Sequence, residues 1–326
     1  MDHGSSVRVT IDDVARAAGV SRQTVSRAMN DKGDISEATR RKVLATIEEL
    51  DYRPSAFARG MRTQKAGTLA LIIPDITNPF FPAVARGAFD AAAARGLGVV
   101  VHNTDADPAA EAEASRRIVD DGVAGAIAFF EEVDDGAVTA LGRRVPLVVA
   151  DRHSPDPTVA SVRSDFATGT RTAIAHLRDR GHVELGMLDG AVHGKPERRR
   201  AFLEALGDDG DRVVTAPATV AGGTAGLREL LARHPGTTAV FAFNDLLAIG
   251  AVRALKAAGR RVPGEVAVVG YDDIPMAALV DPPLTTVHTD KYELGRTLVE
   301  VLGRRLDGHP AEHRTLAPRL VVRGTS

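Results

Sequence analysis

The sequence predicts an α/β protein in which a small helical head precedes a two-lobed core of doubly wound parallel sheets. Residues 10–50 show helical periodicity and no strand pattern. From residue 68 onward, short apolar runs alternate with amphipathic helical segments, as parallel sheets require. A chain of 326 residues is also too long for one compact unit, so two or three units are expected.

The composition is that of a globular protein without membrane segments or disulfides. Hydrophobic residues make up 44% of the chain, yet no apolar run approaches the length of a membrane span. The first seven residues are polar and lack the apolar region of a secretory signal. The chain has no cysteine, which fits a reducing compartment. We therefore expect a cytoplasmic protein.

The segment over residues 10–30 predicts two short helices joined by a tight turn. Thr10 followed by Asp13 is a capping-box pattern that starts the first helix. Gly19 permits the turn, and Ser21 can cap the second helix. This order is that of a helix-turn-helix, whose second helix enters the DNA major groove.

The second helix, expected over residues 22–29, begins with side chains that can read base edges. Arginine suits the two acceptors of guanine, and glutamine suits the donor and acceptor of adenine. Arg22, Gln23 and Arg27 are placed for such contacts. The alternative is an Ala-rich helical hairpin with no role in DNA binding.

A third helix, expected over residues 37–50 with Ser36 as its cap, would close a three-helix head. Its apolar positions recur at helical spacing: Val43, Leu44, Ile47 and Leu50. The basic run at residues 40–42 either contacts phosphates or forms a solvated face. Residues 1–63 carry 11 Lys and Arg against 9 Asp and Glu, and the remainder 30 against 34. One head would therefore bind DNA weakly, and a dimer is needed.

Three segments resemble the DNA-binding head of the lactose-repressor (LacI/GalR) family of bacterial transcriptional regulators: D-V-A-R-A-A-G, V-S-R-Q-T-V-S-R-A-M-N and I-S-E-A-T-R-R-K-V-L-A-T-I-E-E-L-D-Y-R-P. The resemblance continues through the whole chain. It implies a helix-turn-helix head over residues 1–54, a hinge helix and linker over 55–66, and an effector-binding and dimerisation core over 67–326. The DNA-contacting residues that it implies are Thr10, Ser21, Arg22, Gln23, Thr24, Ser26, Arg27, Asn30, Ser36, Thr39, Tyr52, Ser55, Arg59 and Met61.

The segment S-A-F-A-R-G-M-R at residues 55–62 is, by itself, a short helix, a coil or a plain linker. In the family, the matching hinge helix folds in the DNA minor groove and inserts an apolar side chain between base pairs. Met61 stands at that position, where leucine is usual. Gly60 disfavours helix by about 1 kcal/mol relative to alanine. We therefore expect this hinge to fold only on DNA.

Seven strands and seven helices are expected in the core. The strand candidates are residues 69–73, 98–102, 125–129, 147–150, 184–188, 239–243 and 266–270. The helix candidates are residues 80–95, 109–121, 165–180, 197–206, 222–233, 245–258 and 291–306. Two such halves, joined near residues 162–165, make a two-lobed core like that of periplasmic sugar-binding proteins.

The resemblance implies two further crossovers between the lobes, near residues 287–290 and 318–320. The first lobe would comprise about residues 67–163 and 290–317, and the second about 164–289 and 318–326. No heptad repeat follows residue 323, so the expected assembly is a homodimer.

In open parallel sheets, ligands bind beyond the carboxyl ends of the strands. The polar residues just past the predicted strands are Asp75, Asn78, Asn103, Asp105, Asp151, Arg152, His193, Arg198, Asn244, Asp245, Asp272 and Asp273. Carboxylates, amides and a guanidinium suit a small, polar, hydroxyl-rich ligand. Strand-end Asp and Asn also serve as helix caps and turn formers, and Asp105, Asn244 and Asp245 fit that alternative.

Nine residues are the candidates for effector contact: Asn78, Phe80, Phe81, Asp151, Arg152, Arg198, Asn244, Asp272 and Thr289. The resemblance implies such contacts at Asp151, Arg198, Asn244 and Asp272 in particular. The segments E-R-R-R-A-F, F-N-D-L-L-A-I-G-A and G-Y-D-D carry this match. Two positions depart from the family. Ala221 stands where an aromatic platform is common, and Phe166 where an amide is frequent, so the identity of the effector does not transfer.

No catalytic constellation is present, since G-x-S-x-G and H-E-x-x-H are absent and the glycine-rich segment 190–196 is one residue short of a phosphate loop. We expect a transcriptional regulator, a repressor in its usual family role, rather than an enzyme, with no cofactor or metal. A homodimer would bind near-palindromic operator DNA under the control of a small, sugar-like effector. The alternative is a solute-binding protein of the periplasmic type, which would have no use for residues 10–30.

Overall fold

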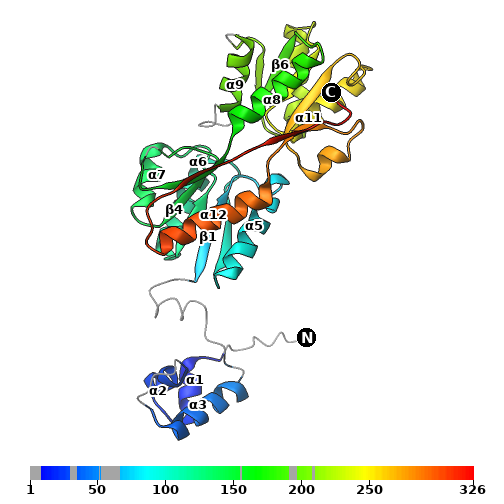
Figure 1. Ribbon diagram of the computed structural model, residues 1–326. Coiled ribbons are helices and arrows are strands. Elements are labelled where there is room, and N and C mark those ends of the chain that lie inside the picture. Colours follow the sequence, from blue (N-terminus) through cyan, green and yellow to red (C-terminus); the bar gives the residue numbers. More distant parts are fainter. Residues whose placement is uncertain are drawn as a thin grey trace, which may run out of the picture. The chain divides into compact units, whose positions relative to one another are not determined.

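The computed structural model describes residues 9–29, 35–50, 52, 67–154, 156–190, 197–207 and 210–326. The chain divides into two compact units, Met1–Gly67 and Thr68–Ser326 (Figure 1). The hinge positions Ser55, Arg59, Gly60 and Met61 lie outside the described residues, as do Asn30 and His193. Among the described helices, none has the length and apolarity of a membrane span.

The described residues of the first unit form three helices: α1 (Ile11–Ala18), α2 (Arg22–Met29) and α3 (Glu37–Glu49). The three predicted caps are confirmed. In each, a side-chain oxygen accepts a hydrogen bond from the backbone amide three residues on: Thr10 from Asp13, Ser21 from Thr24 and Ser36 from Thr39. Gly19 ends α1 with a φ of 66°, which glycine adopts without strain.

The small core of this unit corrects one prediction for the third helix. Val43 is fully buried, but Leu44 is 40% exposed. The buried face that starts at Val43 continues three residues on, at Thr46, whose hydroxyl donates to the carbonyl of Lys42 at 3.0 Å. Leu44 lies about 100° further around the helix and therefore faces away from α1 and α2.

The second unit contains two six-stranded sheets, one in each lobe. The first sheet has the order β11-β5-β4-β3-β1-β2. Its strands are β1 (Thr68–Ile73), β2 (Gly98–Asn103), β3 (Gly125–Ala128), β4 (Leu147–Ala150), β5 (Ala160–Ser164) and β11 (His313–Leu316). The second has the order β12-β10-β9-β8-β6-β7. Its strands are β6 (Leu185–Gly190), β7 (Val213–Ala216), β8 (Ala239–Ala242), β9 (Ala267–Asp272), β10 (Thr285–His288) and β12 (Arg319–Val321).

Helices cover both faces of each sheet, which explains why the central strands are continuous apolar runs. Alternate residues of β1 belong to two different cores, one facing α5 and α12 and the other facing α6 and α7. The first-lobe helices are α5 (Phe80–Ala94), α6 (Pro108–Asp120), α7 (Asp135–Gly142) and α12 (Lys291–Leu306). The second-lobe helices are α8 (Phe166–Asp179), α9 (Glu197–Leu206), α10 (Val220–Arg233), α11 (Asp245–Ala257) and the 3₁₀ turn η1 (Pro275–Ala278).

All seven predicted strands and seven predicted core helices are present, with ends that differ by at most two residues. The elements that were not predicted are α7, η1, β5, β7, β10, β11 and β12. The described strands pair in parallel, except that β10 and β12 are antiparallel.

The chain passes between the two sheets three times. It leaves the first sheet after β5, returns after β10 to form α12 beside α5, and crosses again between β11 and β12. Figure 1 shows the last crossing as a long dark-red strand that runs from one lobe to the other. Each lobe is therefore built from separate stretches of the sequence.

Two glycines let α5 and α12 approach each other backbone to backbone. A Cβ atom on Gly87 of α5 would lie 2.0 Å from the carbonyl oxygen of Tyr292. A Cβ atom on Gly295 of α12 would lie 2.0 Å from the carbonyl oxygen of Val84. No side chain fits at either position, so the two helices form one closely packed pair.

Candidate functional site

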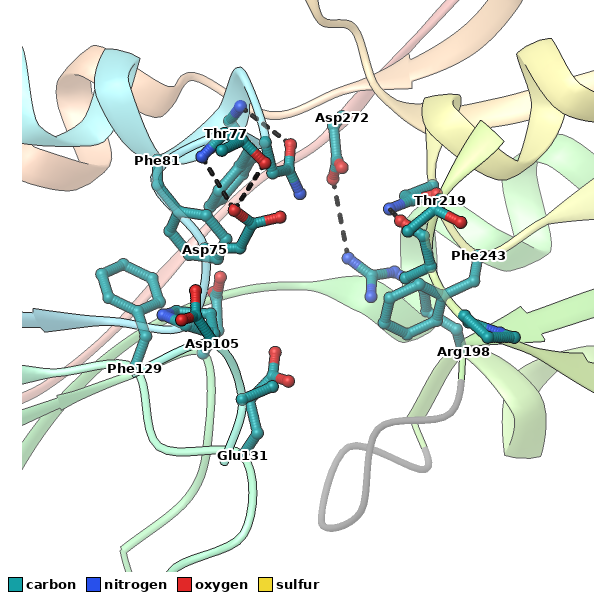
Figure 2. A pocket seen from close by; sticks show the side chains of 18 of the residues that line it. Asp75, Thr77, Phe81, Asp105, Phe129, Glu131, Arg198, Thr219, Phe243 and Asp272 are labelled. Atoms are coloured by element: carbon teal, nitrogen blue, oxygen red, sulfur yellow. Dashed lines mark hydrogen bonds and ion pairs between the residues drawn. The ribbon is translucent and has the colours of Figure 1, made fainter. Parts of the chain in front are cut away.

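A cavity of ≈ 500 Å³ lies between the two lobes, at the carboxyl ends of their strands. Its size is that of a small-molecule site. Seven of the predicted effector residues line it: Asn78, Phe80, Phe81, Asp151, Arg198, Asn244 and Asp272. Figure 2 shows the first-lobe residues, including Asp75 and Glu131, across from Arg198 and Phe243 of the second lobe. A ligand that fills this cavity would contact both lobes.

Hydrogen bonds within the first lobe fix the acidic residues that follow β1 and β2. The carboxylate of Asp75 accepts from the amide and the hydroxyl of Thr77, at 2.8 and 2.7 Å. The carboxylate of Asp105 accepts from the side-chain amide of Asn103 at 2.6 Å. The side-chain oxygen of Asn103 in turn accepts from the backbone amide of Ile76 at 2.7 Å. The two loops are thereby joined, and they present carboxylates to the cavity before a ligand arrives.

Three phenylalanines form an apolar wall beside these carboxylates. The ring centroids of Phe80 and Phe81 lie 5.1 Å apart, and that of Phe129 lies 6.4 and 5.5 Å from them. All three pairs are edge-to-face, which aromatic quadrupoles favour. A rigid wall of this kind suits the apolar face of a ligand whose edges carry polar groups.

On the second-lobe side, the guanidinium of Arg198 is enclosed by aromatic rings. Its Cζ atom lies 4.0, 4.2 and 4.4 Å from the ring centroids of Phe166, Phe243 and Tyr271. The residue is only 6% exposed, and its Nη2 atom lies 3.7 Å from Oδ1 of Asp272. Its Nε atom has no hydrogen-bond partner among the described residues. Arg198 is therefore a cation that aromatic rings hold in the wall of the cavity.

Three of the residues that bring carboxylates to the cavity have a positive φ angle, a backbone conformation that L residues rarely adopt. The φ angles of Asp105, Asp151 and Asp272 are 52°, 53° and 104°. The side chain of Asp151 is further fixed, because its Oδ1 accepts from the backbone amide of Ser164 at 3.0 Å. Such conformations cost free energy and tend to persist where they serve a binding site.

Asn244 lines the cavity and also caps α11, so the predicted cap is confirmed, and contact with an effector stays a prediction. Its side-chain oxygen accepts from the amide of Leu247 at 2.9 Å, and its nitrogen donates to the carbonyl of Ala218 at 3.3 Å. The neighbouring Asp245 does not line the cavity and is fully buried. Burial, followed by the negative charge of Asp272, raises the pKa of Asp245 well above its ordinary value.

Two predicted effector residues do not line the cavity. Arg152 donates to the carbonyl of Val133 at 2.8 Å and pairs with Asp135 at 2.6 Å, so its guanidinium is engaged in the first lobe. Thr289 is buried at the crossover into α12, where its carbonyl accepts from Lys291 at 3.0 Å.

The structure adds lining residues that were not predicted. They lie one to three positions from predicted ones or directly after β7, a strand that was not predicted: Pro74, Thr77, Ala106, Phe129, Glu131, Pro217, Ala218, Thr219 and Phe243. Asp75 and Asp105, two of the strand-end candidates, also line the cavity. Phe129 and Phe243 directly follow β3 and β8, so the strand-end rule would have found them had it included apolar residues.

The first unit presents part of the predicted DNA-reading surface. Arg22 and Gln23 are exposed at the start of α2, and Arg27 is half-buried. Arg22 lies 3.9 Å from Asp12, an exposed pair that a phosphate or a base could displace. Ser26 and Tyr52, which were also predicted to contact DNA, are largely buried among the three helices.

Comparisons with known proteins agree with this arrangement. A model of bacterial regulatory proteins of the lacI family matches residues 10–55, and one of a periplasmic binding protein-like domain matches residues 174–326. The HTH-type transcriptional repressor PurR of Photobacterium profundum is 31% identical over 325 residues, 96% of this chain and 97% of that protein. The ribose operon repressor of Escherichia coli K12 is 33% identical over 328 residues, 97% and 99% of the two chains.

Solved structures resemble the whole chain as well. The lac repressor dimer bound to operator and the anti-inducer ONPF has a TM-score of 0.85 and 28% identity, over 98% of this chain and 99% of that one. The complex of the transcriptional regulator CelR with cellobiose has a TM-score of 0.74 and 31% identity, over 98% and 100%.

A helix-turn-helix unit joined to a two-lobed core with a small-molecule cavity defines a DNA-binding regulator that responds to an effector. The chain belongs to the LacI family of bacterial regulatory proteins.

Proposed function

We propose that this protein is a transcriptional repressor whose homodimer binds operator DNA and whose DNA affinity is set by a small, hydroxyl-rich effector in the cavity. The observation that carries the proposal is the presence, in one chain, of a capped helix-turn-helix and of a cavity shared by two lobes. Such a regulator would act in the cytoplasm and would carry out no catalysis of its own.

The DNA-binding part of the proposal depends on α2. The hydrogen bonds of Thr10 and Ser21 cap the N-termini of α1 and α2, the two helices of the helix-turn-helix. Arg22 and Gln23 are exposed at the N-terminus of α2, the end that reaches base edges in this motif. Two copies related by a two-fold axis would place two such helices in successive major grooves of a near-palindromic site.

The chemistry of the cavity suggests an uncharged ligand rich in hydroxyl groups. Its described lining holds one guanidinium and five carboxylates: Arg198, Asp75, Asp105, Glu131, Asp151 and Asp272. Carboxylates accept hydrogen bonds from hydroxyl groups and repel phosphates and other anions. Three relatives of known structure were solved with cellobiose, ribose and lactose, which fits this chemistry.

A ligand held by both walls would favour lobe closure, because it gains contacts only when the lobes approach each other. Closure would change the distance between the two hinge segments of a dimer and so its fit to the operator. The hinge over residues 55–66, with Met61 as the side chain inserted into DNA, remains a prediction. If the closed lobes fit the operator, the effector promotes DNA binding. If the open lobes fit it, the effector releases the DNA.

Two measurements test the proposal. In the first, the purified protein is titrated with the promoter DNA of its own and neighbouring genes, and a salt-dependent mobility shift is expected. In the second, thermal unfolding is followed with D-ribose, cellobiose, lactose and their phosphorylated forms. A ligand that binds the native state raises the midpoint. Ligand binding without any DNA binding would instead support the solute-binding alternative.

A further inference from the structure

The turn that carries Asp272 is held in an unusual backbone conformation. Asp272 ends β9 and Asp273 follows it, with φ angles of 104° and 55°. Only the first of the two lines the cavity. Since two consecutive residues in this region are costly, other groups must hold the turn in place.

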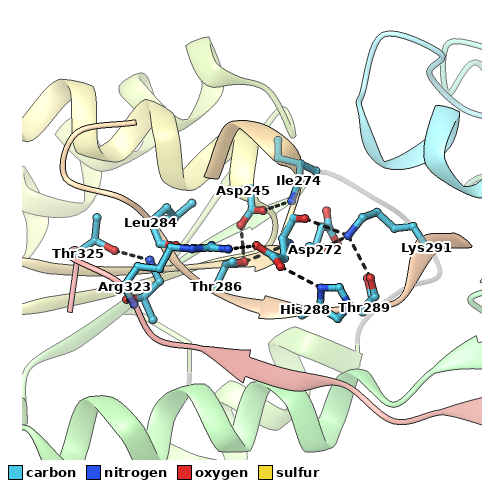
Figure 3. Close-up of polar contacts among 12 residues, drawn as sticks. Asp245, Asp272, Ile274, Leu284, Thr286, His288, Thr289, Lys291, Arg323 and Thr325 are labelled. Carbon is cyan, nitrogen blue, oxygen red and sulfur yellow. Dashed lines mark hydrogen bonds and ion pairs between the residues drawn. The ribbon is translucent and has the colours of Figure 1, made fainter. Parts of the chain in front are cut away.

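The group that holds the turn is the ammonium of Lys291 (Figure 3). Its Nζ atom donates to the carbonyl of Asp272, to that of Asp273 at 3.1 Å and to that of Thr289 at 3.0 Å. An ammonium has three donors, and all three are used here. Lys291 is only 8% exposed. Burial lowers the pKa of Lys291, although the neighbouring carboxylates of Asp272 and Asp273 act in the opposite direction.

Lys291 belongs to a different lobe from the turn that it holds. It is the first residue of α12, which packs on α5 in the first lobe. The turn follows β9, in the middle of the second-lobe sheet. Lys291 follows Asp272 by 19 residues and Asp273 by 18, and the crossover from the second lobe to the first lies between them.

A second set of contacts fixes the turn to its own lobe. The carboxylate of Asp273 pairs with His288 at 2.9 Å and with Arg323 at 2.7 Å. The next amide, that of Ile274, donates to the buried carboxylate of Asp245 at 2.8 Å. Side chains of the second lobe therefore hold the carboxylate of Asp273, whereas the carbonyls of Asp272 and Asp273 are bonded by a first-lobe side chain.

We propose that Lys291 is a positioning residue that directs the carboxylate of Asp272 into the cavity and links that carboxylate mechanically to the first turn of α12. The role of the cavity as the effector site rests on the proposed function; the link itself does not. A change at Asp272 alters the carbonyls that Lys291 binds and thereby the start of α12, where the amides of Glu293 and Leu294 bond to Asp290.

The side chain type matters, because three carbonyls arranged around one point match a tetrahedral ammonium. A guanidinium is planar and spreads its donors over a fork, so arginine would reach only some of these acceptors. Methionine has a similar unbranched apolar stem and no donor. Lys291→Met and Lys291→Arg therefore remove all or part of the hydrogen bonding with little loss of packing.

The test is amide hydrogen exchange of the full-length protein, followed by mass spectrometry, without DNA or any ligand. Peptides over residues 270–275 and 288–295 report the turn and the start of α12. In Lys291→Met, both should exchange about tenfold faster, because opening at these two places no longer breaks buried hydrogen bonds. Lys291→Arg should recover part of the protection. Lys256→Met is the matched control, because Lys256 also donates to a backbone carbonyl, that of Asp281, but outside this network.

The mechanical link is tested by adding Asp272→Asn, which removes the charge of the carboxylate and keeps its shape. In the parent protein, this change should alter exchange over residues 288–295 severalfold. In the Lys291→Met background it should alter the turn peptide only. Equal effects on residues 288–295 in both backgrounds would overturn the link. A loss of protection spread evenly over all peptides of Lys291→Met would reduce Lys291 to a general contributor to stability.

The result is independent of the test of function. A protein that binds no operator DNA could still show the coupled exchange, and one that represses transcription could lack it. If Lys291→Met does not fold, Lys291→Arg with and without Asp272→Asn gives the same comparison, with a smaller difference between the backgrounds.

Discussion

The guanidinium of Arg198 and the carboxylate of Asp272 lie 3.7 Å apart, and both side chains are only 8% exposed. The separation exceeds a hydrogen bond, so the two charges compensate each other as an ion pair. Both groups line the cavity. The pair is therefore neutral as a whole and places one donor group and one acceptor group in the cavity wall.

The first prediction concerns this pair. Arg198→Ala or Asp272→Asn should abolish the rise in thermal midpoint caused by whichever sugar stabilises the parent protein, because each removes a group that bonds the ligand. Operator affinity without ligand should be retained. Arg152→Ala is the control, since this arginine bonds to Val133 and Asp135 and does not line the cavity. A wild-type ligand response in Arg198→Ala would remove Arg198 from the site.

The second prediction concerns base reading by α2. Arg22→Ala should weaken operator binding by about 1–3 kcal/mol per half-site and relax the preference at one base pair. The measurement is a titration of both proteins with operator variants. Arg16→Ala serves as the control, because Arg16 lies in α1 and pairs with Asp13. An equal loss of affinity on every sequence would mean that Arg22 contacts only phosphate.

The third prediction concerns the contact between α5 and α12. Gly295→Ala should lower the free energy of unfolding by about 1–3 kcal/mol, because the new methyl group would overlap the carbonyl of Val84. Urea unfolding measures the change. Gly236→Ala is the matched control, since nothing lies within 4 Å of its added Cβ. Stability equal to that of the parent would show that the two helices can separate slightly at no cost.

The fourth prediction is a pH dependence that arises from Asp273. Burial by itself raises the pKa of this carboxyl, but hydrogen bonds from Arg323 and His288 outweigh it, and the net pKa lies below the ordinary value. The unfolded chain then binds protons more readily, so this contribution to stability is complete above about pH 4 and is lost as pH falls through the lower folded pKa. The free energy of unfolding of Asp273→Asn should therefore fall less steeply on acidification from pH 6 to 3.

The check for this fourth prediction is a series of urea unfolding curves across that range. Asp281→Asn is a suitable control, because its carboxylate is almost fully exposed. The prediction would be contradicted if the free energy of unfolding of the parent and of Asp273→Asn changed with pH in the same way.

Features that depend on nearby residues were predictable from the sequence. The caps at Thr10, Ser21 and Ser36 require only a side chain and an amide three residues on. The strand β1 is a continuous apolar run, because helices cover both of its faces. By contrast, β5 reads A-S-V-R-S and β11 reads H-R-T-L, and these two strands are neighbours although about 150 residues separate them. The residues near each strand in the sequence therefore do not predict that the two strands pair.

The same distinction applies to the site. Asp75, Asp105, Arg198 and Asp272 were all found because they follow predicted strands, and the resemblance pointed to Arg198 and Asp272 as well. Thr219 was missed because it follows β7, a short strand that was not predicted. Arg152 was predicted because it follows a strand, but the backbone at Asp151 has a φ of 53°, and the side chain of Arg152 bonds to the loop that contains Val133.

The three crossings of the chain between the sheets bear on how the protein is made. The first sheet is complete only with β11 and the second only with β12, and these strands lie at residues 313–316 and 319–321. Neither lobe can close until nearly the whole chain has left the ribosome, whereas all three helices of the head lie within the first 50 residues. During synthesis, the head can therefore fold while both lobes are still incomplete. A truncation after residue 300 would damage both lobes at once.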